Sequence, residues 1–334
     1  MTQTLMKPVA PTIALVLGFL HASCSHSATP VIQPGAVWRD TEGEVIQAHG
    51  GGIVQLGGTF YWFGENRSPR PVSPPFGFVK LYSSTDLGRW VPRGNVLMAQ
   101  HSGDLAVGRM VERPKVIFNR GTRKYVMYMH IDAADYSEAR VGVATSDTID
   151  GQYAYLGSFQ PFGHQSRDMT LFEDTDRTVY LVYEDRARGV GIAQLSEDAL
   201  TVARDVALIP RPYEGLAVAK IDGTYFLLGS HLTSWAANPN QYAIATSVEG
   251  PWSDFSDIAP PATNTYDSQS TFILPVQGAR KMTYVYLGDR WNAARLDDSR
   301  YIWMPLDVRN QSVSLPAPRP WTIDVMSGLT RIVQ

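Results

Sequence analysis

One stretch of the sequence predicts the fold: Arg211-Pro-Tyr-Glu-Gly-Leu-Ala-Val-Ala-Lys-Ile-Asp-Gly-Thr-Tyr-Phe-Leu-Leu-Gly-Ser230. Residues 216–220 form an apolar run, and residues 225–228 are aromatic or aliphatic. Asp222-Gly223 between them is typical of a tight turn, because glycine adopts positive φ without strain. This order predicts a β-hairpin. Glu214 stands directly before the first strand, and glutamate is almost never buried without a partner, so it is not core material.

The same pattern occurs five times along the chain. In each copy a polar residue precedes a strand, a turn and an aromatic-rich second strand. These polar residues are His49, Glu112, Asp168, Glu214 and Gln269. A second motif of the form small-Ser-x-Asp/Glu-x-x-Gly-x-aromatic follows the hairpins, most clearly in residues 82–90, 144–153 and 245–252. Five units of about four strands predict an all-β fold, a five-bladed β-propeller, whereas a generic β-sandwich does not explain paired motifs in a fixed order.

The predicted propeller has a direct consequence for the polar residues. The first strand of every blade lines the central axis, so residues at the starts of these strands should converge on one funnel. Three of the five are carboxylates, and glycosidic bond cleavage needs one protonated acid at the leaving oxygen and a second group on the opposite face. Crowded carboxylates raise each other's pKa, which can keep one of them protonated near neutral pH.

Composition and motifs exclude several other function classes. The formal net charge of −3 gives no basic face for nucleic acid. The sequence has no Ser-His-Asp order, cysteine nucleophile, HExxH motif or dinucleotide fingerprint. Its 44% hydrophobic content is ample for a buried core.

Residues 1–28 are predicted to be a targeting segment. Lys7 precedes an apolar run at residues 13–20 that is too short to span a bilayer, and Ser27-Ala28 offers a cleavage site. The single cysteine, Cys24, follows Ala22-Ser23, which resembles a bacterial lipoprotein signal. Two outcomes stay open: a secreted or periplasmic protein, or an outer-membrane lipoprotein anchored at Cys24. Residues 30–334 are predicted to form the propeller, without a disulfide.

Several motifs together resemble glycoside hydrolase family 43, and within it the exo-β-1,3-galactanase branch. The resemblance covers nearly the whole chain after the targeting segment. The motifs are Phe60–Glu65, Val111–Asn119, Gln165–Asp168, Ser230-His231 with Trp235, Ser268-Gln269, Gly288–Trp291 and Ser299–Trp303. The family implies a five-bladed propeller that hydrolyses with inversion, in agreement with the repeats.

The resemblance also implies roles for individual residues. Glu214 corresponds to the general acid, Glu112 and Gln269 to essential groups on the terminal galactose, and Asp168 to the carboxylate that tunes the acid. Further substrate contacts are expected at Glu65, Tyr136, Asp185, Trp235, Arg290 and His49. Most of the family has a base aspartate on the first blade, where this chain has His49-Gly-Gly-Gly. The galactanase branch also lacks it, so the water would be positioned by Glu112 or by Gln269, the latter through its amide tautomer.

The repeats and the resemblance together predict an exo-acting, inverting hydrolase that releases galactose or substituted galactose units from β-1,3-galactan or arabinogalactan side chains. An α-L-arabinofuranosidase, a β-xylosidase and a non-catalytic sugar-binding propeller are the alternatives. We expect a monomer that needs no cofactor and binds no nucleic acid. Structural calcium at the propeller axis stays open.

Overall fold

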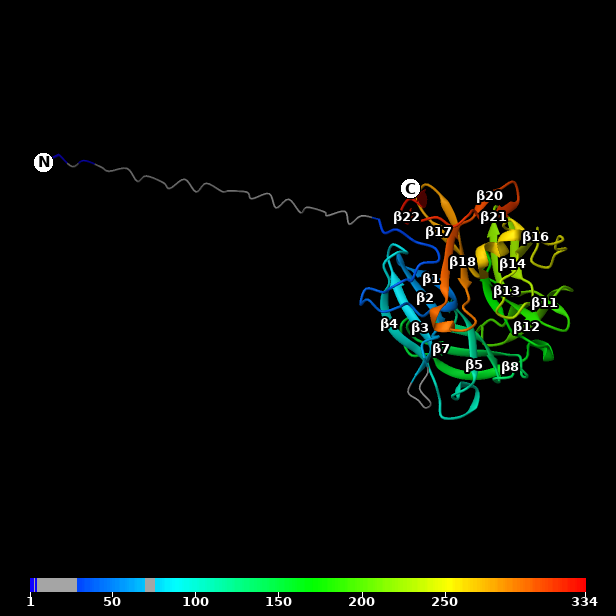
Figure 1. Ribbon diagram of the computed structural model, residues 1–334. Helices are drawn as coiled ribbons and strands as arrows, with labels where there is room; N and C mark the ends of the chain where they lie inside the picture. Colours follow the sequence, from blue (N-terminus) through cyan, green and yellow to red (C-terminus); the bar gives the residue numbers. More distant parts are fainter. Residues whose placement is uncertain (3, 5–28, 70–75) are drawn as a thin grey trace.

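The computed structural model describes residues 1, 2, 4, 29–69 and 76–334. The predicted targeting segment, including Cys24, lies almost wholly outside the described residues. Five antiparallel sheets follow one another around a central axis, as the sequence repeats predict (Figure 1). In each of them the strands are joined in sequence order, so every blade is a simple meander. No helix in the described ranges has the length and apolar character needed to cross a membrane.

The first two blades each have four strands. Blade one consists of β1 (His49–Leu56), β2 (Thr59–Glu65), β3 (Gly77–Ser84) and β4 (Val91–Met98). Blade two consists of β5 (Met110–Asn119), β6 (Lys124–Asp132), β7 (Arg140–Ser146) and β8 (Ala154–Phe159).

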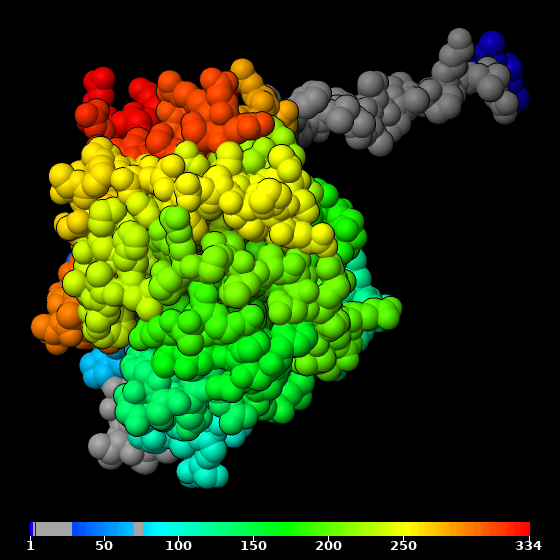
Figure 2. All heavy atoms as spheres, turned by 90° about the vertical axis from the view of Figure 1, so that its right-hand side faces the viewer, coloured from blue at the N-terminus to red at the C-terminus, as the bar shows by residue number. Residues whose placement is uncertain are grey.

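The next two blades repeat this plan. Blade three consists of β9 (Met169–Glu173), β10 (Val179–Asp185), β11 (Gly189–Leu195) and β12 (Val202–Ile209). Blade four consists of β13 (Glu214–Ile221), β14 (Thr224–Ser230), β15 (Asn240–Ala245) and β16 (Ser256–Asp257). Figure 2 shows these two blades, green to yellow, packed side by side beneath the red C-terminal segment.

Blade five is a three-stranded sheet. It consists of β17 (Gln269–Gln277), β18 (Met282–Arg290) and β19 (Arg300–Pro305), and the short helix α1 (Asn264–Asp267) precedes it. Two small hairpins follow it, made of β20 (Asp307–Arg309) with β21 (Ser312–Ser314) and β22 (Trp321–Asp324) with β23 (Leu329–Ile332).

The ring closes without a covalent link. Ile32, near the start of the described domain, forms an antiparallel bridge with Trp321, with N–H···O distances of 2.8 and 3.0 Å. The Gly35 amide donates to the Tyr301 carbonyl oxygen in β19 at 2.7 Å. The N-terminal segment is therefore held against the last blade by backbone hydrogen bonds.

Hydrophobic side chains are buried between adjacent blades, because both faces of each sheet are covered. The densest contact surrounds Trp62, which is 2% exposed. Its ring centroid lies 4.6 Å from that of Trp303, 4.8 Å from Tyr301 and 5.1 Å from Trp90. These rings join blade one to blade five.

Truncating the Trp62 side chain should destabilise the propeller. We expect Trp62→Ala to lower the free energy of unfolding by about 3–5 kcal/mol, because it removes transfer free energy and leaves a cavity. Urea unfolding followed by circular dichroism measures this. Leu56→Ala is the control, since Leu56 is 48% exposed and its loss should cost no more than about 0.5 kcal/mol. Equal effects of the two substitutions would contradict the central role of Trp62.

Bulges interrupt the innermost strands beside the residues predicted to form the site. They lie between His49 and Gly52, between Glu112 and Lys115, and between Glu214 and Ala217. The residue after each predicted site residue has positive φ: 57° at Gly50, 54° at Arg113 and 64° at Gly215. A bulge inserts an extra residue and changes the direction of neighbouring side chains. This local geometry turns Glu112 and Glu214 toward the axis.

Candidate active site

A cavity of about 570 Å³ lies where the inner strands begin. Its lining includes seven residues that the sequence predicted for the site: Glu65, Glu112, Tyr136, Asp168, Glu214, Trp235 and Gln269. Of the five strand-start residues predicted to converge, four line this cavity: Glu112, Asp168, Glu214 and Gln269.

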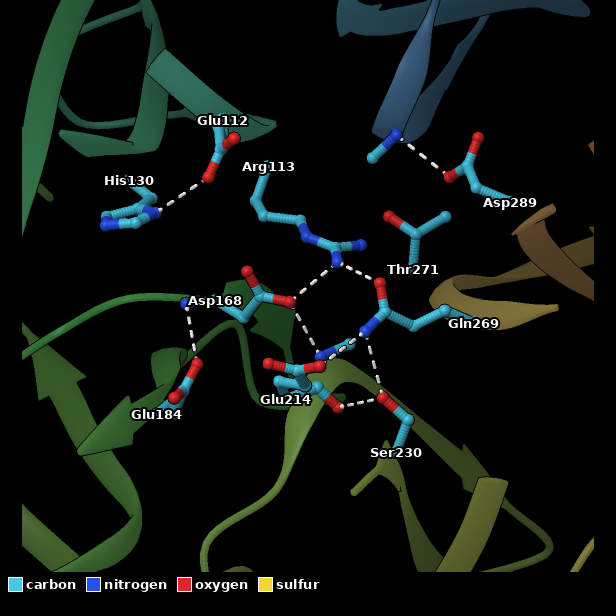
Figure 3. Close-up of polar contacts among 12 residues, drawn as sticks. Glu112, Arg113, His130, Asp168, Glu184, Glu214, Ser230, Gln269, Thr271 and Asp289 are labelled. Carbon is cyan, nitrogen blue, oxygen red and sulfur yellow. Dashed lines mark hydrogen bonds and ion pairs between the residues drawn. The ribbon is translucent and has the colours of Figure 1, made fainter. Parts of the chain in front are cut away.

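Each blade brings two polar residues to this end of the axis, one at the start of its first strand and one opposite it at the end of its second strand. The cross-strand pairs are His49 with Glu65, Glu112 with His130, Glu214 with Ser230, and Gln269 with Asp289. In blade three the Glu184 amide donates to the Asp168 carbonyl oxygen at 2.8 Å, which places these two residues opposite each other. Figure 3 shows labelled residues of blades two to five meeting around the axis.

Glu112 is held as an anion by three donors. Arg67 Nη2 lies 2.7 Å from its Oε1, Tyr136 Oη donates to the same oxygen at 2.9 Å, and His130 Nδ1 lies 3.3 Å from Oε2. Burial opposes ionisation, but the Arg67 and His130 charges keep the pKa of Glu112 far below its usual range. Burial likewise opposes protonation of His130, yet its hydrogen bonds to Asp132 and Glu112 raise its pKa to about 9. Glu112 therefore stays negative near neutral pH.

Glu214 has the opposite environment. It is 7% exposed, and burial, followed by repulsion from Asp168 and Glu184, raises its pKa to about 8. Asp168 accepts a hydrogen bond from the Gly215 amide at 2.8 Å and forms an ion pair with Arg113 Nη2 at 2.7 Å. The cavity thus holds Glu214, which retains its proton near neutral pH, and Glu112, which does not.

Gln269 connects Glu214 to the opposite wall. Its Nε2 donates to Glu214 Oε1 at 3.1 Å and to Ser230 Oγ at 3.0 Å. Its Oε1 accepts from Trp291 Nε1 at 2.9 Å and from Arg113 Nη2. Figure 3 shows the contacts of this amide with Arg113, Glu214 and Ser230.

Three predicted contact residues do not line this cavity. His49 is fully buried, hydrogen-bonded through Nδ1 to Asp289 at 2.9 Å, and stacked on Tyr301. Asp185 accepts from the Ala187 amide at 3.0 Å and is 2% exposed. Arg290 donates to the Tyr266 carbonyl oxygen at 2.6 Å, at the side of the cavity.

Sequence reasoning missed six charged residues of the cavity lining: Arg67, Arg113, Asp135, Arg167, Glu184 and Arg186. A signal for Glu184 was present, because the register of the β9–β10 hairpin places it opposite Asp168. Successive residues of a strand face opposite sides of the sheet. Asp185, the neighbour predicted in place of Glu184, therefore faces away from the cavity. Arg113 forms an ion pair with Asp168.

The residues described do not fit calcium at the axis. No group of three or more His, Cys, Asp or Glu side chains in the described ranges is arranged to hold a metal ion. Between the inner strands β1 and β5, the backbone oxygen of Gly50 accepts from the buried Lys115 Nζ at 2.8 Å. The Lys115 side chain thus already hydrogen-bonds to a backbone oxygen beside the axis.

Comparisons with known proteins agree with this geometry. The exo-β-1,3-galactanase of Phanerochaete chrysosporium, solved with galactose, is 40% identical, with a TM-score of 0.86 over 91% of this chain and 71% of that one. The exo-β-1,3-galactanase of Clostridium thermocellum is 35% identical, with a TM-score of 0.85 over 91% and 68% of the two chains. A search of curated proteins found no match. The sequence profile of glycosyl hydrolases family 43 matches residues 52–273, and with these relatives it shows that the chain belongs to glycoside hydrolase family 43.

Proposed function

We propose that this protein is an exo-acting, inverting glycoside hydrolase that removes galactose from the end of β-1,3-galactan. The observation that carries the proposal is Glu214, a buried acid with a raised pKa, in a cavity that also holds the ionised Glu112. The similarity to exo-β-1,3-galactanases supports the substrate class. A variant of the Phanerochaete chrysosporium enzyme was solved with β-1,3-galactotriose.

The first part of the mechanism is proton donation. Glu214 gives its proton to the departing glycosidic oxygen, so the leaving sugar departs as an alcohol rather than an alkoxide. Asp168 and Glu184 supply the negative charge that keeps this proton in place until the bond breaks. Arg113 and the Gly215 amide hold Asp168 in position for that role.

The second part is attack by water. In an inverting hydrolase the water approaches the anomeric carbon from the face opposite the leaving group. We assign the positioning of this water to Glu112, whose negative charge also stabilises the positive charge that develops on the sugar. Its three donors, Arg67, Tyr136 and His130, fix its carboxylate in one orientation.

Product analysis tests the proposal. Wild-type protein should release galactose from the non-reducing end of β-1,3-galactan, and proton NMR at early times should show the α-anomer first. A β-anomer would overturn inversion. Cleavage of aryl arabinofuranosides or xylosides, without galactose release, would favour the alternative exo-glycosidases. Binding of galactan without any product would favour a sugar-binding propeller.

Trp235 is the proposed platform for the sugar. It lines the cavity, its ring makes an edge contact with Trp291 at 5.1 Å, and the Arg67 guanidinium lies 5.6 Å from its centroid. We expect Trp235→Ala to raise KM by about tenfold, because an aromatic contact contributes about 1.4 kcal/mol. Steady-state kinetics on β-1,3-galactobiose measures this. Trp235→Phe should recover most of the affinity, and an unchanged KM for the alanine variant would contradict the assignment.

A further inference from the structure

Asp132, the last residue of β6, is completely buried, although it does not line the cavity. Its carboxylate accepts hydrogen bonds of 2.9, 2.8 and 3.1 Å from the backbone amides of Ala133, Glu138 and Ala139. These bonds tie together the two ends of the loop at residues 133–139, which connects β6 to β7. Tyr136 lies in the middle of this loop and donates to Glu112 Oε1 at 2.9 Å. Asp132 therefore closes the loop that brings the Tyr136 hydroxyl into the cavity.

The middle of this loop has little packing of its own. Ala134, Asp135 and Ser137 are exposed, and Tyr136 is only partly buried. Tyr136 also has a positive φ of 58°, a backbone conformation that is unfavourable for a residue with a bulky side chain. Exposed segments with few contacts change conformation most readily. Hydrogen bonds at the ends of the loop therefore help to keep Tyr136 in place, and Asp132 accepts three of them.

The same carboxylate holds His130, which is two residues earlier and on the same face of β6. Asp132 Oδ2 accepts from His130 Nε2 at 2.9 Å and from Arg167 Nη1 at 3.1 Å. The other ring nitrogen, Nδ1, lies 3.3 Å from Glu112 Oε2, and Figure 3 shows the ring pointing at that carboxylate. An ionised carboxylate only accepts hydrogen bonds, so each ring nitrogen needs a hydrogen to face one. Asp132 thus sets both the direction and the charge of the ring.

Every partner of Asp132 is a donor, and this arrangement requires a carboxylate. Burial opposes ionisation of Asp132, but the hydrogen bonds from His130 and from the Glu138 amide keep its pKa below the usual range. An asparagine in its place would have one accepting oxygen and one NH₂ group, which cannot accept. Turned one way, the NH₂ group meets two backbone amides of the loop; turned the other way, it meets the Ala139 amide, Arg167 and His130. Neither orientation satisfies both the loop and the ring.

We propose that Asp132 is a positioning residue of the active site, which fixes Glu112 indirectly by holding the His130 ring and the Tyr136 loop in place. The inference rests on the proposed hydrolase function and adds to it a residue outside the cavity lining. Two of the three donors to the Glu112 carboxylate then depend on one buried group. The third donor, Arg67, approaches from the segment after β2.

The titration of His130 tests the effect on the ring without any substrate. In wild-type protein the imidazole should stay protonated through neutral pH, with a midpoint near 9. NMR of the ring C–H groups, assigned by comparison with His130→Gln, measures this. In Asp132→Asn the midpoint should fall by about 1–3 pH units, the range for loss of a close opposite charge. Glu112 and Asp168, the other acidic groups that act on the ring, and Arg167, which shares Asp132, are unchanged in this variant.

Two results of this titration would overturn the inference. A wild-type His130 that is neutral at pH 7 would turn a lone pair of one ring nitrogen toward a carboxylate, so Asp132 could not be holding it as a donor on both sides. This result needs no variant and is decisive even if Asp132→Asn fails to fold. An unchanged midpoint in folded Asp132→Asn, with folding checked by circular dichroism, would do the same.

Kinetics test the effect on the reaction. Asp132→Asn should lower kcat on β-1,3-galactobiose by about 10- to 100-fold, as for a misplaced catalytic group. β-Galactosyl fluoride releases fluoride with little acid assistance, and it should show a loss of similar size, because Glu112 acts on the sugar and its water rather than on the leaving oxygen. A loss confined to galactobiose would place the effect on Glu214 and would overturn the inference.

A double-mutant cycle tests the effect on the loop. If Asp132 acts through Tyr136, removal of the tyrosine hydroxyl should matter less once the loop is released. Tyr136→Phe should therefore lower kcat in wild-type protein, but by less than about twofold in Asp132→Asn, which is the usual limit for additive effects. Two losses that simply multiply would show that Asp132 does not act through Tyr136, against the inference.

The control is Asp147→Asn, which changes another aspartate of blade two, 82% exposed at its side chain and paired with Lys124. It should match wild type in rate and leave the His130 titration unchanged. If wild-type protein hydrolyses neither substrate, the proposed function fails, and the NMR midpoint alone then decides whether Asp132 holds His130. If wild type cleaves both substrates and Asp132→Asn matches it in rate, the inference fails while the proposed function stands.

Discussion

Glu214→Gln is expected to lower kcat/KM on β-1,3-galactobiose by about 10³- to 10⁴-fold, at the upper end of what general acid catalysis contributes. Glutamine keeps the size of the side chain and can still accept from Gln269 Nε2, which lies 3.1 Å from Glu214 Oε1. It has no proton for the leaving oxygen. Steady-state kinetics on galactobiose and on β-galactosyl fluoride should show a large loss only on the first substrate.

The control for this variant is Glu249→Gln, which removes an exposed carboxylate paired with Arg204. It should leave kinetics and unfolding unchanged. Wild-type kcat/KM in Glu214→Gln would contradict the assignment of the acid, and a loss of the same size on both substrates would assign Glu214 to a different step.

The pH profile follows from the same group. The acid must be protonated to act, and its pKa is raised to about 8 by burial, then by Asp168 and Glu184. Activity should therefore persist through neutral pH and fall as pH rises through about 8. Glu184→Gln removes one of the two repelling charges, so it should shift this limb to lower pH. A profile that does not respond to Glu184→Gln would contradict this electrostatic origin.

Glu112→Gln has the second largest expected effect. It should lower kcat/KM by about 10²- to 10³-fold, the range for loss of one group that stabilises transition-state charge. It should also reduce stability by up to about 3–5 kcal/mol, because Arg67 and His130 lose a buried anion. Glu65 remains beside Arg67 and Asp132 beside His130, so each cation keeps one carboxylate partner. Kinetics and urea unfolding measure the two effects.

A milder substitution separates an effect on catalysis from an effect on folding. Tyr136→Phe deletes one hydrogen bond, from Tyr136 Oη to Glu112 Oε1 at 2.9 Å, and should cost about 0.5–1.5 kcal/mol. We expect kcat to fall while the protein stays folded, since Glu112 keeps its two charged partners. Unchanged rates in both variants would remove Glu112 from the reaction.

The repeat pattern was enough to predict the propeller because each blade repeats the same sequence features: a polar residue, a hairpin and a turn. It also predicted the convergence of Glu112, Asp168, Glu214 and Gln269, since a ring places equivalent positions of each blade around one axis. These parts depend on periodicity, which a sequence displays directly.

The parts of the site that could not be predicted from the sequence depend on the directions of individual side chains. His49 occupies the same strand position as Glu214, yet it turns to Asp289 and is fully buried. Arg67 reaches the cavity from the segment after β2, where no repeat fixes its direction. The positive φ of 54° at Arg113 sets the direction of its side chain, and the sequence does not predict this backbone conformation for an arginine. These side-chain directions are set by contacts with residues far away in the sequence.

The bridge between Ile32 and Trp321 joins two segments that lie far apart in the sequence. During synthesis this contact cannot form until Trp321 has emerged, although single hairpins can form earlier from neighbouring residues. Until then the nascent propeller is an open arc, and its catalytic centre is incomplete before Gln269 in blade five has been added.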